Sequence, residues 1–203
     1  MTQTLLLATN NPHKVDEFRS IFLPYDVVLQ TPDELGLFID VEESGSTYFE
    51  NARLKASACW KEGQIPVLSD DSGLEVEALD GAPGIHSHRF LPDPNATSHD
   101  RCLYLLEHLK DSPRPWRAAF HCEVVLLTSQ GAILTSHGIC KGEIIPEFRG
   151  KNGFGYDPIF LVDGTARTMA ELSPDTKNRL SHRGKAALEM TAQLGIPRRS
   201  DLG

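Results

Sequence analysis

Two adjacent aspartates, Asp70 and Asp71, occupy positions at the end of an apolar run, where packing does not explain charged side chains. They follow residues 65–68, a short apolar run that predicts a buried strand. Neighbouring side chains of a strand point to opposite faces, so only one of the two carboxylates is expected to face a binding site. Repulsion between close carboxylates raises a pKa or is relieved by a cation, and Mg²⁺ prefers such oxygen ligands. Residues 69–73 fit an Asp-rich turn equally well, because Asp, Ser and Gly are turn formers.

A candidate anion site lies near the N-terminus. Residues 4–8 predict a strand, 9–12 a polar turn, and 12–22 an amphipathic helix. A helix start presents N–H groups and a partial positive charge to an anion. Lys14 is poorly placed against the helix dipole unless a phosphate lies in front of it, although an ordinary solvated lysine is the alternative. The turn has no glycine and is not a Walker loop.

A second helix is predicted to begin after Thr47, whose spacing from Glu50 forms a capping box. Asn51 and Lys55 lie four residues apart and share a face of this helix, which makes Lys55 a second candidate cation. Glu50 is explained by the cap. Glu43, in the preceding loop, has no such explanation and is a candidate metal ligand.

The C-terminal third carries a glycine-rich aromatic loop at residues 153–157. A nucleotide base stacked on an exposed ring there gains about 1–3 kcal/mol. The alternative is an aromatic anchor with tight turns. One helix is predicted from Ser173 to Pro197, with Lys177, His182 and Arg183 near its start; ordinary charged helix faces explain these residues equally well.

The whole chain limits the class of protein. It has 203 residues, 40% hydrophobic and 24% charged, which suits one large domain or two small lobes. The net charge of −8 argues against binding a nucleic-acid polymer. The four cysteines form no CxxC pair, so reduced, buried thiols in the cytoplasm are expected. No signal-peptide pattern is present and no apolar run reaches roughly 18 residues, so no membrane association is expected.

Further elements complete an α/β pattern. Strands are predicted at 25–29, 74–79, 117–127 and 133–140, and a helix capped by Ser98 is predicted to run to Lys110. The glycine-rich loop leads into residues 159–161.

The chain resembles the Ham1 or RdgB-like inosine triphosphate pyrophosphatases. The resemblance rests on motifs that occur in the family order from the first strand to the last helix: residues 9–14 (TNNPHK), 43–47 (ESGST), 49–56 (FENARLKA), 70–74 (DDSGL), 81–85 (GAPGI), 120–122 (FHC), 153–158 (GFGYDP), Lys177 and 181–184 (SHRG). Where the family often has a tyrosine and then a small residue after Ile85, this chain has His86 and His88. Asn10 replaces a frequent glycine.

The resemblance implies an α/β fold with a central twisted mixed β-sheet flanked by helices, and two lobes with a cleft between them, all within a single domain at 1–203. It implies Mg²⁺-dependent hydrolysis of purine nucleoside triphosphates (ITP, dITP and XTP) to the monophosphate and pyrophosphate by a cytoplasmic homodimer. Rival hypotheses are a similar pyrophosphatase for other modified nucleotides and a nucleotide sensor without turnover.

The resemblance also assigns roles to residues. Asp71 would be the proton acceptor, and Glu43 and Asp71 would bind the metal. Asp70 is expected not to bind the metal directly: it would support the residues that do, or bind the metal through a water. The phosphates would be bound by Thr9, Asn10, Asn11, Pro12, His13, Lys14, Lys55 and Ser72. The base and sugar would be bound by Phe154, Gly155, Tyr156, Asp157, Lys177, His182 and Arg183.

Overall fold

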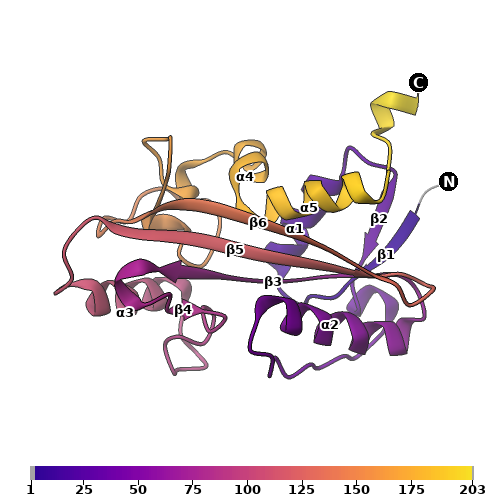
Figure 1. Ribbon diagram of the computed structural model, residues 1–203, viewed down its shortest axis with the longest axis horizontal. Helices are drawn as coiled ribbons and strands as arrows, with labels where there is room; N and C mark the ends of the chain where they lie inside the picture. Colours follow the sequence, from indigo (N-terminus) through magenta and orange to yellow (C-terminus); the bar gives the residue numbers. More distant parts are fainter. Residues whose placement is uncertain (1–2, 203) are drawn as a thin grey trace. The chain divides into compact units, whose positions relative to one another are not determined.

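The structure is a computed structural model that describes residues 3–202 (Figure 1). The helices are α1 (Pro12–Phe22), α2 (Tyr48–Gly63), α3 (Ser98–Leu109), α4 (Pro174–Leu180) and α5 (His182–Gln193). The strands are β1 (Gln3–Leu7), β2 (Val27–Gln30), β3 (Val67–Val76), β4 (Pro83–Gly84), β5 (Trp116–Leu127), β6 (Ile133–Ile144) and β7 (Phe160–Val162). Within this part of the chain, no helix is long and apolar enough to cross a membrane.

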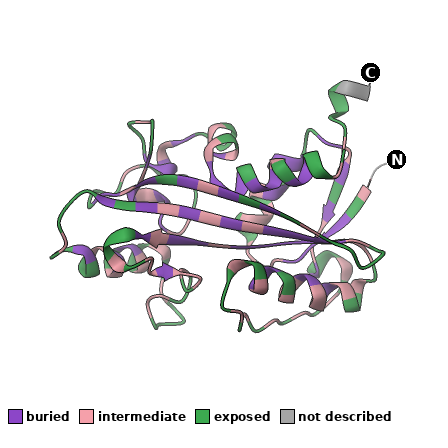
Figure 2. Cartoon of the chain, viewed as in Figure 1, coloured by how far each residue is buried: buried purple, intermediate pink, exposed green. Residues whose placement is uncertain are grey.

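The strands form one mixed sheet of seven strands in the order β2-β1-β3-β5-β6-β7, with β4 paired to β3. Strand β1 pairs in parallel with β2 and with β3, whereas β4 and β7 are antiparallel to their partners. Buried and more exposed residues alternate along the first part of β5 (Figure 2), as expected for a strand with two different faces. The predicted mixed sheet flanked by helices is confirmed.

The chain divides into two compact units. Unit 1 contains residues 1–71, 122–138 and 183–203, and unit 2 contains residues 72–121 and 139–182. Strands β3, β5 and β6 each contribute residues to both units. The chain passes between the units at four points, after residues 71, 121, 138 and 182, and three of these points (71, 121 and 182) fall within the motifs that the sequence singles out.

Unit 1 has an apolar core on each face of its part of the sheet. On one face, Phe18 and Phe22 of α1 and Met190 of α5 pack with Leu68 of β3. On the other face, α2 packs against residues that include Val67 of β3. Helices α1 and α5 therefore cover one face and α2 covers the other (Figure 1), so successive residues of β3 meet different helices.

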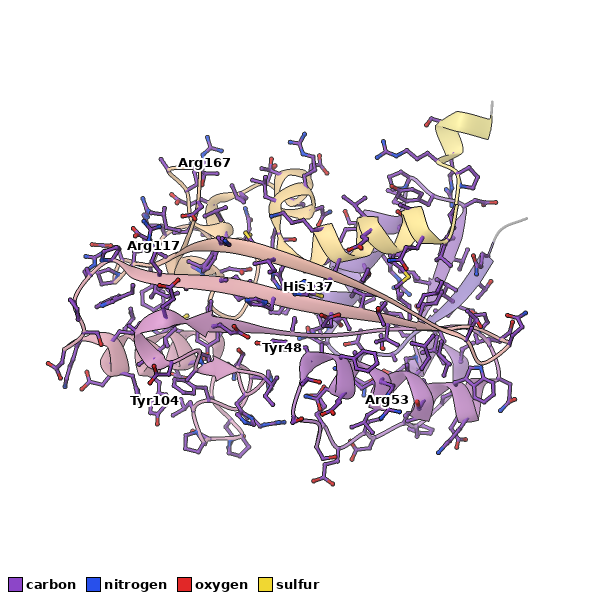
Figure 3. The ribbon with its side chains drawn as sticks, viewed as in Figure 1. Tyr48, Arg53, Tyr104, Arg117, His137 and Arg167 are labelled. Atoms are coloured by element: carbon purple, nitrogen blue, oxygen red, sulfur yellow. The ribbon has the colours of Figure 1, made fainter. Side chains whose placement is uncertain are left out.

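Unit 2 has its own core. Leu105 and Leu109 of α3 pack with Leu74 of β3, Trp116 of β5 and Ile159 beside β7. Tyr104 lies on the same helix (Figure 3). Its ring makes an edge contact with the ring of Phe90, with the ring centroids 5.3 Å apart. Each unit thus buries enough apolar surface to form a cluster by itself.

The pair of aspartates lies inside a strand and not in a turn. Residues 65–68 and 74–79 were predicted as separate strands, but β3 runs without interruption from Val67 to Val76. The turn-forming residues 69–73 remain extended because β3 pairs with neighbours at both ends, with β1 at Leu68 and with β4 at Leu74.

Two helix boundaries also differ from the prediction. The last helix is split, because Ser181 adopts an extended conformation with ψ 157° and its N–H closes α4 by donating to the carbonyl of Lys177 at 2.8 Å. Serine favours helix ends over helix interiors. The cap of α3 is Thr97 and not Ser98, because Thr97 and Asp100 form a reciprocal capping box.

Candidate active site

The turn between β1 and α1 has the predicted strand–turn–helix form. Asn11 is the N-cap of α1, and its Oδ1 accepts the N–H groups of His13 at 3.0 Å and Lys14 at 3.4 Å. Thr9 Oγ1 accepts the N–H of Asn11 at 3.2 Å. Pro12 occupies the first helical turn, where its lack of an N–H has no cost. The cap and the proline therefore fix the point at which the side chain of Lys14 projects from α1.

Asp70 lies on the α1 and α5 side of β3 and is 1% exposed. Its Oδ2 contacts Lys14 Nζ at 3.0 Å and Arg183 Nη2 at 3.2 Å. Arg183 also donates from Nη1 to Glu17 Oε2 at 2.5 Å. The buried group thus contains two cations and two carboxylates, which satisfies the requirement that buried charges be paired.

Neighbouring charges control the pKa of Asp70. Burial alone raises this pKa, but the positive charges of Lys14 and Arg183 outweigh burial and lower it well below its ordinary value. Burial likewise lowers the pKa of Arg183, but Asp70 and Glu17 outweigh that effect and raise it. Asp70 and Arg183 are consequently both charged. Burial and the Asp70 charge raise the pKa of the Cys122 thiol, whose Sγ lies 3.9 Å from Asp70 Oδ2.

Asp71 lies on the α2 side of the same strand and is 6% exposed. Its Oδ2 accepts Asn51 Nδ2 at 3.1 Å, and its Oδ1 lies 3.4 Å from Lys55 Nζ. The same ammonium group contacts Glu43 Oε1 at 2.6 Å. Lys55 therefore bridges the two carboxylates that the sequence nominates as metal ligands.

The pKa of Asp71 shifts in the opposite direction to that of Asp70. Burial raises it, and the attraction of Lys55 and Lys14 does not cancel burial because the nearby Glu43 charge adds to the increase. Burial lowers the pKa of Lys55, but Asp71, Asp70 and Glu43 together raise it above its ordinary value. Lys55 therefore stays charged, whereas the carboxylate form of Asp71 is destabilised.

The Asp71 and Glu43 pair suits a hard cation. Both side chains offer oxygen donors, and both already approach one positive charge, that of Lys55. Among the described residues, no group of three or more His, Cys, Asp or Glu side chains is arranged to hold a metal. Two carboxylates are enough for Mg²⁺, which takes its other ligands from water and substrate phosphates.

In unit 2, Gly153, Phe154, Asp157 and Lys177 form a second group, which we call the aromatic loop cluster. Lys177 Nζ lies 2.5 Å from Asp157 Oδ2 and 5.1 Å from the centroid of the Phe154 ring. The N–H of Phe154 donates to the same Asp157 oxygen at 2.9 Å. A Cβ on Gly153, which has φ +76°, would lie 2.0 Å from that oxygen, so the cluster requires glycine there. Phe154 is half-buried.

The other predicted binding residues of unit 2 have structural contacts. Tyr156 is buried and its hydroxyl donates to the carbonyl of Ser87 at 2.9 Å. The N–H of Gly155 donates to Ser98 Oγ at 3.1 Å. His182 is 5% exposed and stacks on Phe120 with the ring centroids 4.8 Å apart.

The remaining predicted residues are more accessible. Ser72 follows Asp71 in β3 and is half-buried, and Asn10, Pro12 and His13 are exposed on the turn before α1 and in its first residues. Arg183, predicted to contact base or sugar, lies in unit 1 and pairs with Asp70 and Glu17.

Two residues of the site are missing from the sequence prediction of functional residues. Glu17 lies one turn after Lys14 on α1 and binds Arg183. Asn51 lies one turn before Lys55 on α2, is fully buried, and binds Asp71. In both cases the signal available in the sequence is a polar residue three or four positions from a candidate lysine.

Comparison with known proteins identifies the family of the chain. The model of the Ham1 family matches residues 5–193. A dITP/XTP pyrophosphatase of Coxiella burnetii is 42% identical over 195 residues, which cover 94% of this chain and 96% of the relative. A dITP/XTP pyrophosphatase of Desulfotalea psychrophila is 42% identical over 193 residues, covering 95% of this chain and 86% of the relative.

Solved structures agree as well. A Ham1 protein from Coxiella burnetii superposes with a TM-score of 0.84 at 41% identity, covering 95% of this chain and 98% of that one. The Ham1 protein of Staphylococcus aureus also has a TM-score of 0.84, at 39% identity and with the same two coverages. The chain therefore belongs to the Ham1 family, and the family resemblance seen in the sequence is confirmed.

Proposed function

We propose that this chain is a nucleoside triphosphate pyrophosphatase that converts the deaminated purine nucleotides dITP, XTP and ITP to the monophosphate and pyrophosphate. The observation that carries the proposal is the setting of Asp71, a buried carboxylate of raised pKa beside Lys55 and Glu43. The dITP/XTP pyrophosphatases that share about two-fifths of its sequence over nearly the whole chain support the same activity. Such an enzyme would remove deaminated purines from the nucleotide pool.

We propose that Glu43 and Asp71 hold Mg²⁺. When bound, Mg²⁺ would supply charge neutralisation for the phosphate oxygens, which lowers the barrier to attack at phosphorus. Lys55 contacts both carboxylates and is the group whose position a bound cation would most directly affect.

The residues of this chain would then act on the triphosphate and on water. Lys14 and Lys55 would stabilise negative charge on the phosphates, with the residues 9–13 turn and Ser72 as further contacts. Asp71 would accept the proton of the attacking water, because its carboxylate is buried in the site beside Lys55. Asp70 would act by holding Lys14, with which it forms an ion pair at 3.0 Å.

The aromatic loop cluster has the chemistry needed for the base. The ring of Phe154 offers a stacking surface, and Asp157 and Lys177 offer an acceptor and a donor. A 6-oxo purine differs from adenine in the polarity of its base edge. A site that leaves a buried polar group unpaired against adenine would therefore discriminate strongly. Gly155, Tyr156, His182 and Arg183 would be further contacts to the base and sugar, as the family resemblance implies.

A panel of nucleoside triphosphates tests the activity. Purified protein with Mg²⁺ is given dITP, ITP, XTP, ATP, GTP and modified pyrimidine triphosphates, and pyrophosphate and phosphate release are measured separately. We expect pyrophosphate release that is much faster with dITP, ITP and XTP than with ATP. Equal rates on ATP and ITP would refute the role in removing deaminated purines, and nucleotide binding without turnover would indicate a sensor.

We also propose a cytoplasmic homodimer in which residues 1–203 form a single domain. All four cysteines are buried and none forms a disulfide, which suits a reducing compartment. The family resemblance supports the dimer. Light scattering on a sizing column would measure the mass in solution, and a single thermal unfolding transition would support one domain because β3, β5 and β6 belong to both units.

A further inference from the structure

Asn51 connects two parts of the candidate metal site that are distant in the sequence. Its side chain is fully buried at the start of α2. Its Nδ2 donates to Asp71 Oδ2 at 3.1 Å, and its Oδ1 accepts the N–H of Gly45 at 2.8 Å. One carboxamide thus joins strand β3 to the loop that carries Glu43, two residues before Gly45.

The orientation of this carboxamide follows from its partners. The Gly45 N–H can only donate, so it requires the amide oxygen. The amide nitrogen then faces Asp71, whose carboxylate can only accept. Because both partners are satisfied in one orientation and neither in the other, the side chain cannot flip without losing both hydrogen bonds.

The loop approaches Asn51 too closely for a larger residue than glycine at position 45. A Cβ on Gly45 would lie 2.7 Å from Asn51 Oδ1 and 2.7 Å from the Cβ of Glu50. The backbone of Gly45 does not have a positive φ, so contact with these neighbours and not backbone conformation excludes a side chain. The loop that carries Glu43 is therefore held against the first turn of α2.

The hydrogen bond to Asp71 also distinguishes its two oxygens. Oδ2 is occupied by Asn51, whereas Oδ1 faces Lys55, which in turn contacts Glu43. Asn51 therefore directs Oδ1 of Asp71 toward the same cation that Glu43 approaches. Arg53, two residues further along α2, lies on the exposed side of the helix (Figure 3) and takes no part in these contacts.

We propose that Asn51 is a positioning residue for the metal site: it holds Asp71 and the Glu43 loop together so that both carboxylates can bind one divalent cation. The inference rests on the proposed function only through the identity of Glu43 and Asp71 as ligands. Partners that orient metal ligands typically contribute 10–100-fold to metal affinity or activity.

The test measures Mg²⁺ binding to the whole protein without nucleotide, by isothermal titration calorimetry, for the wild type and Asn51→Ala. We expect the variant to bind Mg²⁺ about 10–100-fold more weakly. In the dITP assay at saturating nucleotide, the Mg²⁺ concentration for half-maximal rate should rise by a similar factor, and excess Mg²⁺ should restore most of the rate. A side chain with a merely structural role would not shift this concentration.

Ser69→Ala is a matched control. Ser69 Oγ donates to the carbonyl of Ala52 at 2.7 Å, so this variant removes a buried hydrogen bond between the same strand and the same helix without touching a carboxylate. We expect Ser69→Ala to keep the Mg²⁺ affinity of the wild type. Gly45→Ala perturbs the other half of the bridge and should weaken Mg²⁺ binding as Asn51→Ala does; it also serves if Asn51→Ala does not fold.

Equal Mg²⁺ affinity in the wild type and in the folded bridge variants overturns the inference, as does equal weakening in Ser69→Ala or a wild type that does not bind Mg²⁺. A wild type that binds Mg²⁺ but does not release pyrophosphate from dITP overturns the proposed function instead, while the comparison of Mg²⁺ affinities still decides the role of Asn51.

Discussion

The two faces of β3 at Asp70 and Asp71 place identical, adjacent side chains in opposite electrostatic settings. Asp70 shares its oxygen with Lys14 and Arg183, and its pKa is lowered. Asp71 faces a single lysine that it shares with Glu43, and its pKa is raised. Both carboxylates are buried, so burial does not explain the difference. The pKa difference is explained by the number of nearby cations and by the sharing of Lys55 with a second carboxylate, that of Glu43.

The different settings of the two carboxylates suggest a structural role for Asp70 and a catalytic role for Asp71. A buried carboxylate that is held by two cations stabilises its surroundings and is a weak base, whereas one that is incompletely compensated is a stronger base and attracts an additional cation. We therefore expect Asp70 to be required mainly for stability and for the position of Lys14, and Asp71 to be required mainly for catalysis.

The largest expected effect is that of Asp71→Asn on the rate. Loss of the proton acceptor should lower kcat for dITP by about 10²–10⁴-fold, while nucleotide binding is largely retained. Steady-state pyrophosphate release and equilibrium nucleotide binding measure the two quantities. Turnover equal to that of the wild type would show that Asp71 has no catalytic role and would remove the proposed difference between the two faces.

Asp70→Asn should have its main effect on stability. Removing one partner of a buried ion pair typically costs about 3–5 kcal/mol, because the buried Arg183 and the partly buried Lys14 then have less compensating charge. The urea midpoint should fall strongly in this variant and much less in Asp71→Asn, whose amide relieves the burial of an incompletely compensated carboxylate. A smaller loss in Asp70→Asn than in Asp71→Asn would contradict the comparison.

The smallest effect is the pH dependence of these stability differences in metal-free protein. The folded-state pKa of Asp70 lies below its ordinary value of 3.8, so its ionised form stabilises the fold above that pH and this contribution is lost as the pH falls further. The deficit of Asp70→Asn should therefore shrink below about pH 4.

The pH dependence of the stability contribution of Asp71 has the opposite sign. Its folded-state pKa lies above 3.8, so its burial cost is present above the folded-state pKa and disappears as the pH falls toward 3.8. The stability difference between wild type and Asp71→Asn should accordingly be largest at neutral pH. Urea titrations at several pH values measure both trends. A deficit of Asp70→Asn that does not change with pH would show that Asp70 is not ionised in the folded protein.

Much of the local structure could be predicted from the sequence. The helix at residues 12–22 has the predicted bounds, because Pro12 and the spacing of Val15, Phe18 and Phe22 act within the helix itself. Thr47 caps α2 as predicted. The opposite orientation of Asp70 and Asp71 follows from strand periodicity only once β3 is known to continue through residues 69–73, where the sequence also allowed a turn. The boundaries that were wrong, at Ser181 and at Thr97, depend on local hydrogen bonds that composition does not specify.

The sequence by itself determined that two adjacent carboxylates follow a buried strand and that lysines lie near two helix starts. Only the tertiary structure decided which carboxylate receives which cations. Arg183 lies 113 residues from Asp70, and Asn51 lies 20 residues from Asp71. Such pairings are created when α1 and α5 pack on one face of β3 and α2 packs on the other. Because electrostatic energy depends on distance and burial, the different roles of two identical residues arise from packing.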